Sequence, residues 1–197
     1  ALDGGGDRHA ADRDLDDVLR VGDRDAVARR ALPVELDLQI AQISGFHLDL
    51  EAEISRASRS RDPLCLLLVD LDNFKSINDN HGHPAGDRVL RTIAQFFRET
   101  LRKVDHVCRY GGEEFAMVLP SCGQELAMEI AERLRGRASE LKIDIGDEES
   151  TKSVSVTLSM GVCCWHPTRR IDENEQTELA EALISRSDQG VYASKEN

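Results

Sequence analysis

The sequence predicts an α+β fold in which helices flank a central β-sheet. The apolar run Leu64–Val69 is continuous, as expected of a strand that is buried on both faces. A segment from about Gly86 to Leu101 repeats apolar residues at helical spacing, and two apolar segments within 106–119 enclose adjacent glycines, which is typical of a β-hairpin. With a further helix and strand behind the hairpin, the elements follow the β-α-β-β-α-β order of the ferredoxin-like plan.

Before the hairpin we expect a helix, a strand and a second helix. The first helix is predicted over Glu51–Ala57 and leads into a strand at residues 64–70. The second helix begins near Gly86, and one of its faces carries apolar residues at the i, i+3, i+4, i+7 spacing of a buried stripe. The residues of this stripe are Leu90, Ile93, Ala94, Phe97 and Leu101.

After the hairpin the pattern predicts a helix, a strand and a last helix. The helix is expected over about residues 123–141, and Gly146–Lys152 is a charged loop. Val154–Cys164 alternates well enough for a strand, and Leu179–Ala193 forms the last helix. The stripe on the helix at 123–141 consists of Leu126, Ala127, Ile130, Ala131 and Leu134.

Residues 1–36 are predicted to be an N-terminal extension, and residues 37–197 the main domain. A chain of 197 residues suits one domain of the usual ~100–200 residues plus such an extension. The extension is rich in Asp and Arg, and Leu15, Val18 and Leu19 suggest a short amphipathic helix. Two interpretations stay open, a signalling helix that joins this domain to another one and a disordered tail.

The composition limits the classes of partner. A formal net charge of -12 and a pI of about 4.9 argue against a general nucleic-acid or membrane-surface binder, which would carry a basic patch. The apolar runs are too short for a membrane span, and the polar N-terminus shows no signal peptide. Five cysteines without metal-ligand spacing predict reduced thiols in a cytoplasmic protein, with Cys163 and Cys164 on opposite faces of a strand and not a redox pair.

The most informative segment is the predicted hairpin turn within Arg109–Phe115. Gly111 and Gly112 can take positive φ, which a two-residue turn demands, and their missing side chains let a phosphate or sugar approach the backbone. Glu113 and Glu114 follow at once, where a divalent cation could join them to such a ligand.

A second pair of acids ends the buried strand. Asp70 and Asp72 are two residues apart and therefore share a face, and a buried carboxylate is costly unless it is paired or metal-bound. One interpretation is that both aspartates cap the next helix. The other joins Asp70 to Glu113 and Glu114 in a Mg²⁺ or Mn²⁺ site of the kind that serves phosphoryl transfer.

Several segments follow one another in the order of a known family's motifs. They are Asp70–Asp79, His81–Asp87, Arg109–Phe115, Val156–Gly161 and Ser187–Lys195. With these motifs the sequence resembles the GGDEF domain of diguanylate cyclases in its GGEEF form, over roughly residues 45–197.

The resemblance implies condensation of two GTP molecules into cyclic di-GMP with release of pyrophosphate. It also implies a sheet related to those of nucleotide cyclases and polymerase palms. One domain would hold one GTP, so the reaction requires a homodimer in which two domains face each other. An upstream sensor domain is expected to regulate the domain, and no nucleic acid is expected as a partner.

The resemblance also assigns roles to residues at the metal and phosphates. Metal binding and catalysis fall to carboxylates and one carbonyl: Asp70, the carbonyl of Leu71, Glu113 and Glu114. Which of the two glutamates assists deprotonation stays open. The nucleotide lies against Gly111 and Gly112, and its phosphates contact Lys75 and Lys195, although either lysine alone would more often be solvated.

A second set of residues is assigned to guanine. Asn78 and Asp87 match the pair that hydrogen-bonds the base, and a carboxylate suits the N1–H and N2–H₂ donors of guanine, which favours GTP over ATP. Phe74 and Leu90 would line the base pocket. The alternative for Asp87 alone is a helix N-cap.

Arg102–Asp105 matches the RxxD inhibitory site of the family, at which the product binds. The alternative is an i, i+3 Arg–Asp pair that closes a helix, worth only a few tenths of a kcal/mol.

Because the sequence departs from the family pattern in two places, other functions stay open. Residues 37–45 lack the Thr-Gly and Asn-Arg of the usual DxLTGLxNR stretch, and the chain stops at Asn197, before the usual Gly-Arg-Asn, as expected of a domain truncated at its C-terminal end. A catalytically silent domain that binds GTP or cyclic di-GMP therefore remains a candidate, and a plain dimerisation scaffold ranks last.

Overall fold

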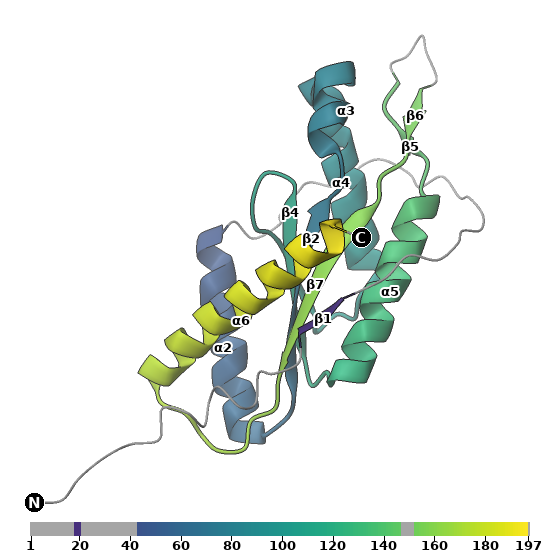
Figure 1. Cartoon of the computed structure of the whole chain (residues 1–197). Coiled ribbons are helices and arrows are strands. Elements are labelled where there is room, and N and C mark those ends of the chain that lie inside the picture. Colours follow the sequence, from purple (N-terminus) through teal and green to yellow (C-terminus); the bar gives the residue numbers. More distant parts are fainter. Residues whose placement is uncertain (1–17, 21–42, 147–151, 197) are drawn as a thin grey trace, which may run out of the picture.

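The computed structural model describes residues 18–20, 43–146 and 152–196. Its main sheet is antiparallel and five-stranded, in the order β1-β7-β2-β4-β3 (Figure 1). Without β1, this order is that of a ferredoxin-like β-α-β-β-α-β fold, so the predicted α+β class is confirmed. The strands of this sheet are β1 (Val18–Arg20), β2 (Leu64–Leu71), β3 (His106–Arg109), β4 (Glu114–Pro120) and β7 (Leu158–Trp165).

Helices cover both faces of the sheet, as Figure 1 shows. On one face lie α2 (Ile43–Ser60) and α6 (Glu173–Lys195), and on the other α4 (His83–Thr100) and α5 (Gln124–Glu140). The short α3 (Phe74–His81) follows directly from the end of β2 and packs against α4. A separate two-stranded sheet consists of β5 (Ile143–Asp144) and β6 (Ser153–Val154). No helix in the described ranges is long and apolar enough to cross a membrane.

Strand β2 is buried along its whole length, as its apolar run predicts. Cys65, Leu67, Val69 and Leu71 belong to the core under α3, α4 and α5. The alternate residues Leu64, Leu66 and Leu68 belong to a second core under α2 and α6. Because side chains alternate along a strand, Asp70 continues the second series and points to the α6 face. This alternation places the acidic end of β2 under the C-terminal end of α6.

The structure changes several of the predicted boundaries. Val18 and Leu19, assigned to an amphipathic helix, lie in strand β1, which pairs with β7. Helix α6 begins six residues earlier than expected, because the Asp172 side chain accepts from the Glu175 backbone while Glu175 returns a bond to the Asp172 backbone, a capping box. Most of the predicted 1–36 extension, and residues 37–42, lie outside the described residues.

The prediction of five reduced thiols was wrong in one respect. Cys65 and Cys164 form a disulfide between β2 and β7. They are direct partners in the antiparallel register and are buried on the same face of the sheet, although 99 residues separate them in sequence. The spacing along the chain gives no signal of such a pair. Cys108, Cys122 and Cys163 remain buried thiols, and burial raises their pKa values to about 12, 11 and 11.

Candidate active site

The backbone segments that carry the acids of the predicted site lie next to one another at the end of β2. Asp70 pairs with Glu114 of β4 on one side and with Ser159 of β7 on the other, so the three side chains share one face of the sheet. The backbone N–H of Leu71 donates to the carbonyl of Glu113 at 3.3 Å, which holds the hairpin loop against the strand. Asp70 is only 8% exposed, and Lys195 Nζ lies 2.8 Å from its Oδ2.

The hairpin turn differs from the prediction. Strand β3 ends at Arg109 and β4 begins at Glu114, so the connection is a four-residue loop and not a two-residue turn. The backbone N–H groups of Tyr110 and Gly111 both donate to the carbonyl of Glu114, at 2.8 and 3.2 Å. A longer loop closed in this way needs no left-handed residue, and neither Gly111 nor Gly112 has positive φ.

Gly111 has a different reason to lack a side chain. A Cβ at this position would lie 2.2 Å from Glu114 Oε2, whereas one at Gly112 would meet nothing within 4 Å. The guanidinium of Arg109 donates to the carbonyls of both glycines and so fixes the loop from outside. The loop thus leaves room for the Glu114 carboxylate beside Asp70.

Neighbouring acids raise the pKa of Glu114. Burial, followed by the charges of Asp70, Asp188 and Glu113, raises the pKa of Glu114, while Lys195 lowers it. Asp188 on α6 belongs to the Ser187–Lys195 motif, but no role was predicted for it from the sequence. It lies seven residues, or two helical turns, before Lys195, a spacing that puts both residues on one helix face.

Asp72 has a structural role. Its carboxylate accepts hydrogen bonds from the hydroxyls of Thr157 and Ser159, both at 2.7 Å, and its N–H donates to the Thr157 carbonyl. It does not cap α3, because the residue at that N-cap is Asn73, whose side chain makes no cap hydrogen bond. The interpretation of Asp70 and Asp72 as helix caps is therefore wrong for Asp72, which instead ties the end of β2 to β7.

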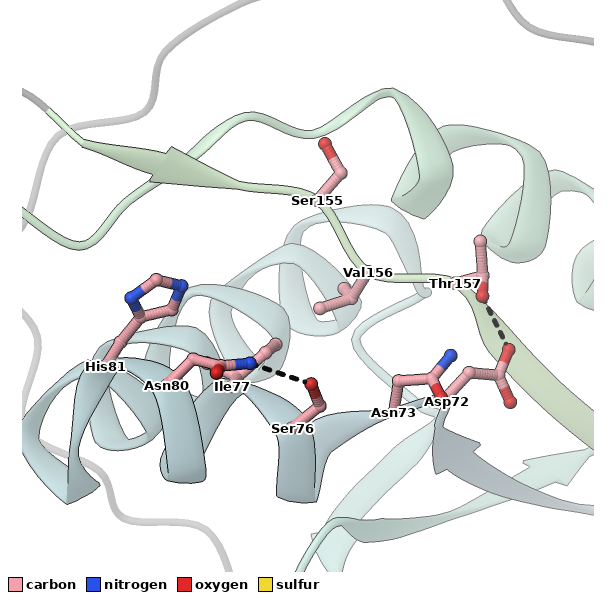
Figure 2. A pocket seen from close by; sticks show the side chains of 9 residues that line it. All are labelled: Asp72, Asn73, Ser76, Ile77, Asn80, His81, Ser155, Val156 and Thr157. Atoms are coloured by element: carbon pink, nitrogen blue, oxygen red, sulfur yellow. Dashed lines mark hydrogen bonds between the residues drawn. The ribbon is translucent and has the colours of Figure 1, made fainter.

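A cavity of about 340 Å³ lies beside this site, between α3 and the residues that lead into β7 (Figure 2). Its lining shares only Asp72 with the acidic end of β2 and contains none of the predicted guanine or metal residues. The lining residues are Asp72, Asn73, Ser76, Ile77, Asn80, His81, Ser155, Val156 and Thr157. In Figure 2 the bond from Thr157 turns the Asp72 carboxylate toward β7 at one end of this cavity.

The predicted guanine residues come together where α3 packs on α4. A Cβ at Gly86 would lie 2.0 Å from Asn78 Oδ1 and 3.1 Å from the Phe74 ring, so Asn78 rests directly against the residue before Asp87. Phe74 and Leu90 are buried and Asp87 is exposed. Since α4 begins at His83 after Gly82, which has a φ of 80°, Asp87 lies inside the helix and the N-cap alternative is wrong.

The donor set suits a hard divalent cation. Asp70, Glu113 and Glu114 supply carboxylate oxygens, and Leu71 offers a main-chain carbonyl at the same strand end. Over the ranges that the structure describes, no three His, Cys, Asp or Glu side chains already converge as a metal site. The Asp70 carboxylate is instead paired with Lys195, so these residues fit a cation once that ion pair opens.

The remaining predicted residues lie outside the cluster. Lys75 is exposed on α3. Arg102 forms a salt bridge with Asp105, with Nη2 at 2.6 Å from Oδ1, and also donates to the Pro120 carbonyl at 3.0 Å. The Asp105 side chain is 0% exposed, and its hydrogen bonds raise the pKa of Arg102 above its ordinary value. The Arg–Asp pair of the alternative interpretation is therefore present, but it lies in the turn that follows α4, which ends at Thr100, and does not close a helix.

Comparison with known proteins places the chain in a family. The family model described as "Diguanylate cyclase, GGDEF domain" matches residues 39–197. Response regulator PleD of Caulobacter vibrioides is 35% identical over 174 residues, which cover 85% of this chain and 36% of PleD. Diguanylate cyclase DgcP of Pseudomonas aeruginosa is 37% identical over 146 residues, which cover 74% of this chain and 20% of DgcP. The chain thus spans about a third or less of these relatives.

Solved structures give the same result. The GGDEF domain of DgcB from Caulobacter crescentus, solved in complex with c-di-GMP, superposes with a TM-score of 0.70 at 26% identity, covering 86% of this chain and 94% of that one. The GGEEF domain of a diguanylate cyclase from Vibrio cholerae gives a TM-score of 0.68 at 33% identity, covering 81% and 93%. The chain therefore belongs to the GGDEF-domain family of diguanylate cyclases.

Proposed function

We propose that this domain condenses two molecules of GTP into cyclic di-GMP and releases two pyrophosphates. The observation that carries the proposal is the acidic cluster at the end of β2, where Asp70 faces Glu114 and Leu71 is bonded to the Glu113 carbonyl. Each 3′-hydroxyl attacks the α-phosphorus of the other nucleotide. An O3′–P bond forms, the bond from phosphorus to pyrophosphate breaks, and the hydroxyl proton is lost.

Different residues would bind the metal ion and the phosphates in this reaction. Asp70, the Leu71 carbonyl and the two hairpin glutamates would hold Mg²⁺ or Mn²⁺, and Lys75 and Lys195 would bind phosphate oxygens. Such an ion, when bound, neutralises phosphate charge and acidifies the attacking hydroxyl. Because one domain offers one set of these residues, two domains must face each other, so the active form in this proposal is a homodimer.

The direct test is incubation with GTP and Mg²⁺ followed by chromatography for cyclic di-GMP, beside a Glu113→Ala variant. The proposal expects product from the wild-type protein alone. Bound GTP without product would instead support the second candidate, a silent domain that binds GTP or cyclic di-GMP and signals through a partner. The altered stretch at residues 37–45 is the observation that favours this second candidate.

The guanine residues give a prediction of their own. Gly86→Ala places a methyl group 2.0 Å from Asn78 Oδ1, so the amide must turn away from its position against residue 86. Loss of one hydrogen bond to the base is expected to raise the KM for GTP about tenfold with little change in kcat. Gly123→Ala is the control, because its Cβ meets nothing within 4 Å. Equal KM values for the two variants would contradict the assignment of Asn78 to guanine binding.

We also propose that product inhibits the enzyme through Arg102 and Asp105. In this structure the guanidinium is held by Asp105 and the Pro120 carbonyl, so the product must open this pair to bind. Arg102→Ala removes charge-assisted hydrogen bonds and is expected to raise the half-inhibiting concentration of cyclic di-GMP at least about tenfold. The exposed neighbour Lys103→Ala serves as control. Unchanged inhibition of the Arg102 variant in steady-state assays would refute the inhibitory site.

A further inference from the structure

The ion pair between Lys195 and Asp70 joins the last helical residue of α6 to the end of β2. Lys195 Nζ lies 2.8 Å from Asp70 Oδ2, and the two side chains are 45% and 11% exposed. Asp70 is therefore largely withdrawn from water, while the lysine reaches it from the solvent side. Within the described ranges, Lys195 is the ion-pair partner of Asp70.

The surroundings of this ammonium group are acidic. The negative charges of Asp72 and Glu113, as well as that of Asp70, act on the Lys195 ammonium group, and the charge of Lys195 acts on Glu114. A cation at this position offsets the repulsion among the carboxylates at this end of the sheet. A divalent cation that binds Asp70 would do the same, and it would compete with the ammonium group for the Asp70 carboxylate.

The backbone of α6 is held firmly while the lysine side chain can turn. A Cβ at Gly161 would lie 1.9 Å from the Ser187 carbonyl, which shows how closely α6 packs on β7. Lys195 itself ends the helix and carries its charge on a flexible four-carbon stem. Exchange of its partner therefore requires rotation of one half-exposed side chain and no movement of the helix.

We propose that Lys195 is a built-in counter-ion for Asp70, which a divalent cation displaces and which then transfers to the triphosphate of the nucleotide. This inference rests on the proposed function of the same site. It assigns two effects of opposite sign to one side chain. The ammonium group weakens the binding of a metal ion by the protein alone, and it strengthens the binding of the metal–nucleotide complex.

The test measures both effects on Lys195→Met, with Lys75→Met as the matched control. Both variants lose one charge that we assign to phosphate binding, but only Lys195 is paired with Asp70. Mn²⁺ binding without nucleotide is followed by electron paramagnetic resonance. We expect Lys195→Met to bind Mn²⁺ about fivefold more tightly than the wild-type protein, and Lys75→Met to be unchanged.

The same variants are then titrated with GTP in saturating Mg²⁺, where both are expected to bind about tenfold more weakly. Mn²⁺ affinity of Lys195→Met that is equal to or below that of Lys75→Met would overturn the counter-ion role, even if the wild-type protein made cyclic di-GMP. Failure of the wild-type protein to bind GTP or form product would instead refute the proposed function. Circular dichroism melting curves establish that both variants are folded.

Discussion

Asp70→Asn is expected to lower the rate of pyrophosphate release from GTP by about 10³-fold or more. The substitution keeps the shape of the side chain but removes the charge that would hold a divalent cation, and the metal's contribution to such a transition state is several kcal/mol. Because the Asp70 side chain is nearly buried, solvent cannot replace that charge. The measurement is a coupled pyrophosphate assay at saturating GTP and Mg²⁺.

Asp62→Asn is the matched control for this prediction. Asp62 is exposed and lies just before β2, at the end of the strand opposite to Asp70. Asp62→Asn makes the same chemical change as Asp70→Asn, but far from the acidic cluster, and should leave the rate of pyrophosphate release unchanged. A comparable loss in both variants, or full activity of Asp70→Asn, would refute the assignment of the acidic cluster.

Gly161→Ala is expected to cost about 3 kcal/mol of stability, at the upper end of what overpacking a core does. The new methyl group would lie 1.9 Å from the Ser187 carbonyl and 2.6 Å from the Val191 backbone nitrogen. Backbone atoms of α6 cannot turn aside as a flexible side chain can, so the helix must move away from β7. That movement would also withdraw Lys195 and Asp188 from the acids.

The control for Gly161 is another glycine in a regular element. Gly136 lies within helix α5, and a Cβ there would meet nothing within 4 Å. Gly136→Ala should therefore stabilise the protein by about 0.5–1 kcal/mol, because alanine favours the helix. Urea unfolding of the two variants measures both changes. A Gly161 variant as stable as the wild-type protein would show that α6 is less tightly packed on β7 than described.

Much of the fold could be predicted because its signals are local. The continuous apolar run of β2 predicts a strand buried on both faces, and the stripe of α4 lies in the core as its spacing requires, except for Leu101, which follows the helix and is only partly buried. The start of α6 was missed although the sequence carries its signal. Asp172 and Glu175 stand three residues apart, which is the spacing of a capping box.

The details of the site that could not be predicted depend on contacts between distant segments. The disulfide of Cys65 and Cys164 follows from strand register, which no spacing along the chain reveals. Likewise, the bonds from Thr157 and Ser159 to Asp72 exist because β7 lies beside β2. Asp188 is one acid among many in an acidic chain, and only the packing of α6 brings its charge to Glu114.

The turn shows a different limit of sequence reasoning. Two adjacent glycines indicate a hairpin correctly, but they do not fix the length of its loop. In the structure the carbonyl of Glu114 accepts two backbone hydrogen bonds and closes a four-residue connection. Gly111 then matters for the space that it leaves beside Glu114 and not for its φ.

The most direct test of the central claim is the stoichiometry of the reaction with GTP. We would quantify pyrophosphate, inorganic phosphate and nucleotide products together after incubation of the wild-type protein with GTP and Mg²⁺. Two pyrophosphates for each cyclic di-GMP, with no inorganic phosphate formed in parallel, is the predicted result. Formation of GDP and phosphate, or bound GTP that is recovered unchanged, would contradict the assignment of this acidic site to cyclic di-GMP synthesis.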